Sequence, residues 1–162
     1  GKRLCSESEW EKASRGTDGR KYPWGNEAAT CEYAVMGELG YDGCGAGTTW
    51  KVGSKPAGSS PYGVMDMSGN VWEWVEDDCH WTYSGSPTNG SAWVAEPREF
   101  IRVERGGGFR TYDIDWLRSS TRNCNYPAAA GYYDHQCGVR CCRSGTSPSG
   151  GLHGRRLWTE GP

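Results

Sequence analysis

The sequence has little aliphatic material and no long hydrophobic run. Hydrophobic residues make up 35% of the 162 positions, and two of them are phenylalanine. No apolar stretch approaches the roughly 20 residues that a membrane helix needs, so membrane insertion is not expected. A net charge of −2 gives no general attraction to nucleic acid or to anionic lipid. Nucleic acids and membranes are therefore not among the predicted partners.

Spacings typical of zinc sites are also missing, although cysteine is plentiful. No C-x-x-C pair occurs, and His80, His135 and His153 form no paired-histidine pattern. Eight cysteines, an even number, instead favour a disulfide framework, as in secreted, periplasmic or cell-surface proteins. Cys141 and Cys142 are adjacent and would point to opposite faces of a strand, so we expect each to bridge to a different element.

Aromatic and turn-forming residues are what the chain has in quantity. Nine Trp and nine Tyr predict a core built from aromatic side chains. Twenty-five Gly and eight Pro predict a loop-rich fold, with residues 17–60 irregular. Short strands are expected at 71–76, 101–105, 116–122 and 138–142.

One helix is predicted near the beginning of the chain. Ser6 and Glu9 have the spacing of a capping box, and Gly16 is a suitable end. Trp10, Ala13 and Ser14 then fall on one face of the helix. We expect this face to be buried.

The run from 66 to 75 suggests an ion site. Asn70 and Glu73 offer side-chain oxygens, and Gly69 allows the sharp turn that would bring carbonyl groups together. Trp72 and Trp74 alternate with Glu73 as strand side chains do, and we expect both indoles to anchor this strand to the core. The alternative is a half-buried strand that follows a Ser-Gly-Asn turn.

A series of short motifs, in this order, resembles the formylglycine-generating enzyme family, also called the sulfatase-modifying factor domain. The motifs lie at 1–13, 22–26, 52–54, 61–63, 66–75, 105–109, 117–119 with Arg122, and 138–141. The resemblance covers residues 1–143 and implies an α+β, C-type-lectin-like fold with short strands and few helices. Residues 144–162 are expected to form a tail or extension. Family domains carry a further segment before the Gly-Lys-Arg-Leu motif, and the expectation is that this chain lacks it.

The resemblance also implies structural calcium. Asn70 and Glu73 would supply side-chain oxygens, with backbone carbonyls from Gly69 and Val71; hard oxygen ligands suit calcium. A second site would use Asp42, with Glu32 in place of the usual Asn. The alternative for Asp42 is an ordinary Asp-Gly turn.

The sequence departs from the family at its reactive centre. The family enzymes oxidise a protein cysteine to formylglycine and use a copper-binding cysteine pair just after the Gly-Gly-Ser-aromatic strand. Thr111 and Trp116 stand at the corresponding positions here, and neither offers a thiolate for copper. Cys124, the nearest thiol, is expected to pair with Cys137. Copper and catalysis are therefore not expected, and a sulfatase-modifying-factor oxidoreductase with a rearranged site is the alternative.

A metal-assisted or Cys-His site is conceivable at His80, beside Asp77 and Asp78, but a solvated turn next to a disulfide cysteine is the favoured interpretation.

The polar and aromatic segments around 112–136 suggest recognition of a protein, peptide or glycan. Such residues on a rigid scaffold give contact area at small entropic cost. The same sector resembles the variable ligand-binding region of proteins diversified by retroelements. One alternative is that these are ordinary loop residues with no binding role. Another is that the chain is a structural module of a larger extracellular assembly. The candidate ligand-binding residues are Tyr112, Asp113, Asp115, Trp116, Arg118, Tyr126, Tyr132, Tyr133, Asp134 and His135.

Overall fold

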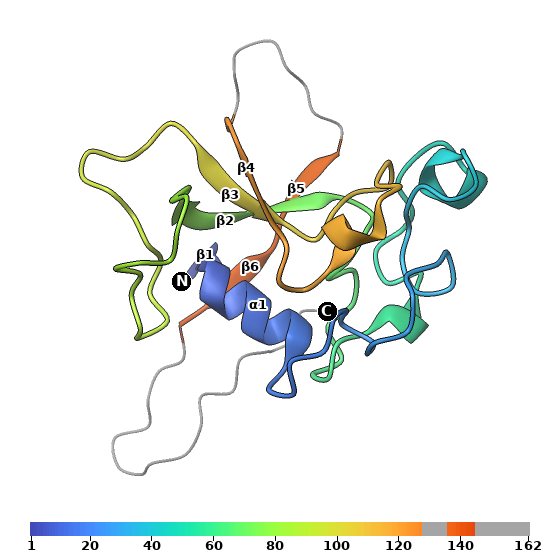
Figure 1. The fold of residues 1–162 in the computed structure, drawn as a ribbon, viewed down its shortest axis with the longest axis horizontal. Helices are drawn as coiled ribbons and strands as arrows, with labels where there is room; N and C mark the ends of the chain where they lie inside the picture. Colours follow the sequence, from blue (N-terminus) through green and yellow to red (C-terminus); the bar gives the residue numbers. More distant parts are fainter. Residues whose placement is uncertain (128–135, 145–162) are drawn as a thin grey trace.

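The computed structural model describes residues 1–127 and 136–144 (Figure 1). It has one α-helix, short strands and long connections, so the predicted α+β, loop-rich class is confirmed for this part of the chain. The elements in chain order are β1 (Lys2–Leu4), α1 (Glu7–Arg15), the 3₁₀ helices η1 (Asp42–Gly45) and η2 (Pro56–Gly58), β2 (Trp72–Asp78), β3 (Arg102–Arg105), the 3₁₀ helix η3 (Ile114–Leu117), β4 (Arg122–Asn125), β5 (Cys137–Val139) and β6 (Cys141–Arg143).

Two small sheets organise these elements. The larger has the order β4-β3-β2-β5, in which β2 runs antiparallel to β3 and parallel to β5. The smaller pairs β1 with β6 in antiparallel fashion, so the beginning and end of the described chain lie side by side. Helix α1 lies beside this pair, below the larger sheet in the view of Figure 1.

Helix α1 forms as the sequence predicts. The Ser6 hydroxyl accepts a hydrogen bond from the Glu9 amide, and the Glu9 carboxylate accepts one from the Ser6 amide, which completes the capping box. Gly16 has a positive φ of 69° and its N–H closes the last turn on the Lys12 carbonyl. Trp10 and Ala13 on the predicted face are buried.

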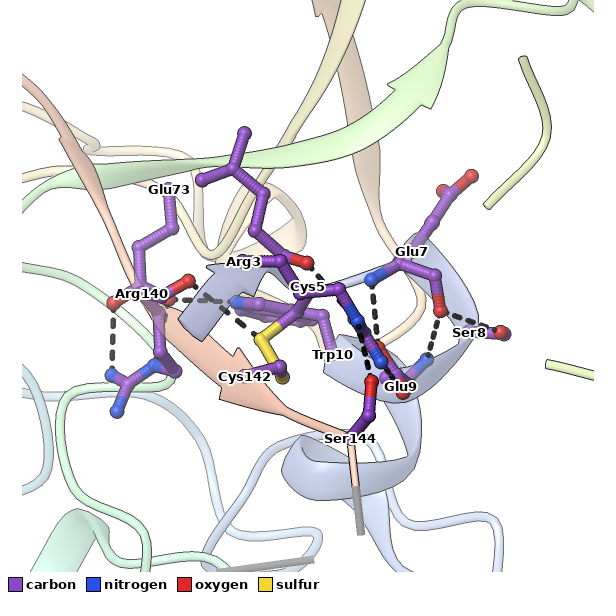
Figure 2. Close-up of a disulfide and its surroundings, with 12 residues drawn as sticks. Arg3, Cys5, Glu7, Ser8, Glu9, Trp10, Glu73, Arg140, Cys142 and Ser144 are labelled. Carbon is purple, nitrogen blue, oxygen red and sulfur yellow. Dashed lines mark hydrogen bonds and ion pairs between the residues drawn. A yellow bond between two sulfur atoms is a disulfide. The ribbon is translucent and has the colours of Figure 1, made fainter. Parts of the chain in front are cut away.

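The main core is built where α1 meets the larger sheet. Trp10 and Ala13 pack there with Met67, Val75 and Val103. The Cys5–Cys142 disulfide joins the same cluster and ties the end of β1 to β6 (Figure 2). Aliphatic and sulfur-containing side chains therefore supply more of this core than the composition predicts, and only one indole is fully buried in it.

Two of the expected strands differ in the structure. Residues 116–122 are not a strand, because Ile114–Leu117 forms η3 and the next strand begins at Arg122. The expected strand at 138–142 is divided at Arg140 into β5 and β6, which belong to different sheets. The strands predicted at 71–76 and 101–105 are present as β2 and β3.

None of the three disulfides in the described residues is a pair that the sequence analysis predicted. Cys31 is bonded to Cys44, and Cys79 to Cys124. The expected Cys124–Cys137 pair is wrong, because Cys124 lies in β4 and Cys137 in β5, at opposite edges of the four-stranded sheet. Edge strands three intervals apart are separated by roughly 14 Å, twice the reach of a disulfide.

The two adjacent cysteines do not both form bridges. Cys142 is buried and bonded to Cys5, whereas Cys141 is exposed and carries no disulfide within the described residues. No helix in residues 1–127 and 136–144 is long and apolar enough to cross a membrane.

Candidate functional site

Gly69 and Asn70 make the sharp turn that was expected before β2. Both have positive φ, 81° and 67°, and a Cβ on Gly69 would lie 2.5 Å from the Val35 carbonyl oxygen. The Asn70 amide donates to Val35, and its side-chain oxygen accepts from the Trp50 amide at 2.9 Å. The turn thus joins separate loops by direct protein hydrogen bonds.

Glu73 points inward from β2 and is buried (Figure 2). Its carboxylate accepts hydrogen bonds from Trp10 Nε1 at 2.7 Å and from two nitrogens of Arg140 at 2.9 and 2.8 Å. Trp72 and Trp74 are half-buried on the opposite side of the strand. Glu73 therefore anchors β2 to the core, and the expected anchoring role of the two indoles is wrong.

These contacts bear on the predicted calcium ligands. A guanidinium group already neutralises Glu73, and calcium bound to the same oxygens would have to displace it. At the second expected site, Asp42 accepts from Tyr112 at 2.7 Å and from Arg110 at 3.1 Å, and Glu32 is exposed. The described residues contain no cluster of three or more His, Cys, Asp or Glu suited to a metal. The side-chain oxygens thus fit calcium poorly in this arrangement, and calcium stays a prediction.

Tyr112 is the best-positioned of the expected recognition residues. Its ring is 48% exposed and lies over Gly37, where a Cβ would come within 2.9 Å of the ring. The Tyr112 hydroxyl donates to Asp42, and this hydrogen bond raises the pKa of the phenol. The Gly37 amide also donates to the Thr111 carbonyl at 3.0 Å, so the Tyr112 ring packs on the disulfide-bridged loop 31–44 and is held in place by it.

Trp116 forms the second aromatic contact surface. It is 41% exposed and meets Trp72 edge to face, with 5.9 Å between ring centroids. The Trp72 amide donates to the carbonyl of Gln136, so β5 begins beside this aromatic pair. Trp116 is therefore held in place by β2 while one side of the ring remains open.

Acidic residues set the shape of the loop between the two aromatic rings. Asp113 caps η3 by accepting from the Asp115 amide at 3.0 Å. Asp115 forms an ion pair with Arg118 at 2.7 Å, and its carbonyl accepts from Thr121 at 2.6 Å. We call Asp42, Tyr112, Asp113, Asp115, Trp116 and Arg118 together the η3 surface.

The other expected ligand-binding residues are not brought into this surface. Tyr126 is exposed just beyond β4. Within the described residues, no hydrogen bond or ring contact joins its side chain to the η3 surface. Tyr132, Tyr133, Asp134 and His135 lie outside the described residues.

Thr111, which the resemblance predicts to stand in place of the first family cysteine, has a structural role. It is buried, and its hydroxyl accepts a hydrogen bond from the Gly108 amide at 2.9 Å. Cys124, the nearest thiol in the sequence, is already bonded to Cys79.

The sequence analysis missed a buried ionic cluster between α1, β3 and β4. Arg105 is fully buried and contacts Glu11 at 2.6 Å and Glu7 at 3.7 Å. Glu7 also pairs with Arg122 at 2.9 Å. Glu7 and Glu11 are spaced i, i+4, which places both acids on one face of the helix. This spacing could have predicted that the acids share a basic partner.

The segment 77–80 was expected to be a solvated turn next to a disulfide cysteine; the disulfide at Cys79 is confirmed, but the solvated turn is wrong. Asp77 and Asp78 are buried at the end of β2, and both accept backbone hydrogen bonds. The His80 ring stacks on Trp93 with 3.7 Å between centroids. Backbone amides donate to both oxygens of Asp77, whereas Asp78 is held by backbone amides together with Arg98 and Arg102.

Comparisons with known proteins agree with this fold. Residues 1–145 match the Sulfatase-modifying factor enzyme 1-like domain. The formylglycine-generating enzyme of Thermomonospora curvata is 33% identical over 160 residues, which cover 87% of this chain and 49% of the enzyme. The structure of PvdO from Pseudomonas aeruginosa superposes with a TM-score of 0.72 at 32% identity, over 86% of this chain and 51% of PvdO. For Treponema denticola variable protein 1 the TM-score is 0.63 at 27% identity, over 87% and 47%. The chain thus spans about half the length of each of these proteins.

Proposed function

This chain belongs to the Sulfatase-modifying factor enzyme 1-like domain family, and we propose that it serves there as a recognition domain rather than as an enzyme. The relatives include a formylglycine-generating enzyme and a hercynine oxygenase, which have different activities, so membership alone does not select a function. The proposal is that the η3 surface binds a protein, peptide or glycan in an extracytoplasmic compartment.

The observation that carries this proposal is the pair of aromatic rings, Tyr112 and Trp116, each nearly half exposed and each held by a neighbour. An aromatic side chain with a fixed orientation loses little entropy when it binds, and its area is available to a partner. Asp42 and Trp72 provide that fixation. The carboxylates and guanidinium groups around the rings supply directional hydrogen bonds for selectivity.

The absence of catalysis is proposed from the residues at the family's reactive positions. Thr111 uses its hydroxyl to hold the turn at Gly108, and Trp116 has no copper-binding atom. Soft copper(I) requires sulfur ligands that these side chains lack.

An extracytoplasmic location is proposed from the disulfides. Three are formed within the described residues, joining Cys5 to Cys142, Cys31 to Cys44 and Cys79 to Cys124. Such bonds persist in oxidising compartments.

Structural calcium at residues 69–73 stays a prediction that depends on residue chemistry alone, and it is not part of the function proposed here because Arg140 already pairs with Glu73. The backbone carbonyls of Gly69 and Val71 are suitable oxygen ligands, while the Glu73 carboxylate would have to exchange Arg140 for the ion. Melting with and without a chelator distinguishes the two arrangements.

Selection from a displayed random-peptide library tests the recognition proposal. Peptides enriched on the intact chain should lose binding by roughly tenfold or more with Tyr112→Ala and with Trp116→Ala, because each removes a positioned aromatic contact. Trp81→Ala is the matched control, since Trp81 is 84% exposed and lies outside the η3 surface. Equal loss with all three variants, or with none, would contradict the assignment of the binding surface.

The enzyme alternative is tested separately by copper(I) titration with thiol counting. Its specific support is the match to a formylglycine-generating enzyme. We expect no tight copper(I) site near Phe109, because the described cysteine nearest in sequence is in the Cys79–Cys124 bond. Tight binding of one copper(I) by two reduced cysteines would overturn the recognition proposal in favour of oxidase activity.

A further inference from the structure

A cavity of about 560 Å³ lies between α1 and the segment 83–93. Its volume is within the range of small-molecule sites. The cavity shares no residue with the η3 surface. What it could bind follows from the groups that line it, independently of the recognition function proposed above.

Two of the carboxylates that line the cavity are neutralised by the protein. Glu7 accepts from Arg122 and from the Tyr83 hydroxyl, both at 2.9 Å. Glu11 accepts from Arg15 at 2.7 Å and from the fully buried Arg105 at 2.6 Å. These acids therefore offer little attraction to an added cation.

The third carboxylate, Asp77, is also occupied. Its two oxygens accept the Trp93 amide at 2.8 Å and the Glu7 amide at 2.7 Å. Burial raises the pKa of Asp77, which further weakens its interaction with a cation. None of the three acids is directed toward a ligand.

Lys12 is the lining cation that the protein leaves available. Its ammonium has no hydrogen-bond or ion-pair partner recorded among the described residues. Arg15 lies one turn further along the same helix and commits one terminal nitrogen, Nη1, to Glu11. The α1 side of the cavity therefore presents one ammonium and part of one guanidinium, which suits a single carboxylate better than a doubly charged phosphate.

The facing wall is aromatic with hydroxyl groups between the rings. Tyr83, Pro87 and Trp93 line it, and the His80 ring supports Trp93 by stacking. Ser86 lies between these residues, and its hydroxyl has no recorded partner in the described chain. A ligand that fills this space needs a ring with an apolar face and with hydroxyl groups at its edge.

We propose that this cavity binds a carboxylate-bearing sugar. The Lys12 ammonium pairs with the carboxylate, the ring lies against Tyr83 and Trp93, and Ser86 hydrogen-bonds a ring hydroxyl. No covalent step is involved.

Titration of the full chain with D-glucuronate, followed by NMR of the backbone amides, tests this site. Shifts should be confined to residues 7–19, 77 and 83–93 and should saturate at concentrations up to about 10 mM, as expected of a weak specific site. D-Glucose lacks the carboxylate and should bind roughly tenfold more weakly or worse, since a charge-assisted contact is lost. Benzoate keeps the carboxylate but has no hydroxyl groups and should also bind more weakly.

Variants separate the contributions of the cavity. Lys12→Ala should weaken glucuronate binding roughly tenfold, and alanine preserves the helix. Lys51→Ala, an exposed lysine outside the cavity, is the matched control and should change nothing. Ser86→Ala should weaken binding of glucuronate but not of benzoate.

Four results would overturn the proposal. They are the absence of saturable shifts with glucuronate, shifts at the η3 surface instead, benzoate binding as tightly as glucuronate, and equal effects of the Lys12 and Lys51 variants. A negative result would leave the peptide-selection test of the η3 surface unaffected, because the two sites share no residue.

Discussion

Acid–arginine pairs occur on both sides of this domain, and their burial separates two kinds of role. Between α1 and β3, Arg105 is fully buried with Glu7 and Glu11. At the η3 surface, Asp115 and Arg118 form a pair at 2.7 Å that is open to solvent, and this distance is close to the 2.6 Å between Arg105 and Glu11. The buried pairs hold the helix on the sheet, whereas the exposed pair orients a loop at little energetic gain.

Removing the buried arginine should give the largest effect. Arg105→Ala removes a fully buried guanidinium that Glu7, Glu11 and the carbonyls of Ser119 and Thr121 share, and we expect a loss of about 3–5 kcal/mol in unfolding free energy. Urea denaturation measures it. Arg118→Ala is the control and should cost less than about 1 kcal/mol. Similar losses for both variants would mean that burial does not separate the two roles.

The disulfide that supports the η3 surface should have the next largest effect. Replacing both Cys31 and Cys44 with Ala opens a loop with a sequence separation of 13 residues, which should cost about 2–3 kcal/mol. Because this loop carries Asp42 beneath Tyr112, peptide binding at the η3 surface should weaken as well. Denaturation and the selected peptides report the two effects. Unchanged peptide affinity would show that the loop does not position Tyr112.

The Arg3–Glu9 pair beside the helix cap should give a smaller, pH-dependent effect. The Arg3 guanidinium donates to Glu9 and lowers the pKa of that carboxyl below its ordinary value of 4.5. The folded state therefore gains stability above about pH 4.5 and loses it as the pH falls through the lowered pKa. Arg3→Ala should remove up to about 1 kcal/mol at pH 7 and flatten this dependence. Denaturation at pH 7 and at pH 3 measures it, and an unchanged slope between them would contradict the assignment.

Chelation of divalent cations should have the smallest effect. With Glu73 held by Arg140 and Trp10, as in Figure 2, we expect the melting temperature to change by less than about 1 °C on addition of chelator. A fall of several degrees, reversed by calcium, would support calcium binding by residues 69–73 instead.

Local signals in the sequence predicted local structure. The Ser6–Glu9 capping box and Gly16 define α1 with the observed bounds, because each depends on contacts within one turn. The alternation of Trp72, Glu73 and Trp74 predicted β2, although not which face was buried. The buried face depends on Trp10 and Arg140, which are more than 60 residues away in the chain.

Features that depend on strand order could not be predicted. The bond between Cys79 and Cys124 forms because Cys79 lies just past the end of β2, where its α-carbon comes within 5.7 Å of that of Cys124 in β4, and the spacing of cysteines does not reveal this. Residues 114–117 form η3 because Asp113 caps them and Leu117 is buried, which overrides the strand tendency of the following segment. The η3 surface itself was predicted in part: Tyr112 and Trp116 have supported rings, whereas Tyr126 lies apart.

The pairing of β1 with β6 has a consequence for how such a domain can be placed in a longer polypeptide. Lys2 lies opposite Arg143, and the Cys5 and Cys142 α-carbons are 4.9 Å apart. Residues 2 and 143 therefore lie at adjacent points of the described structure. A host protein could carry residues 2–143 as an insertion in one surface loop, with hardly more separation between the loop ends than a hairpin requires. A protease cut between Cys5 and Cys142 would still leave the two pieces covalently joined by the Cys5–Cys142 disulfide.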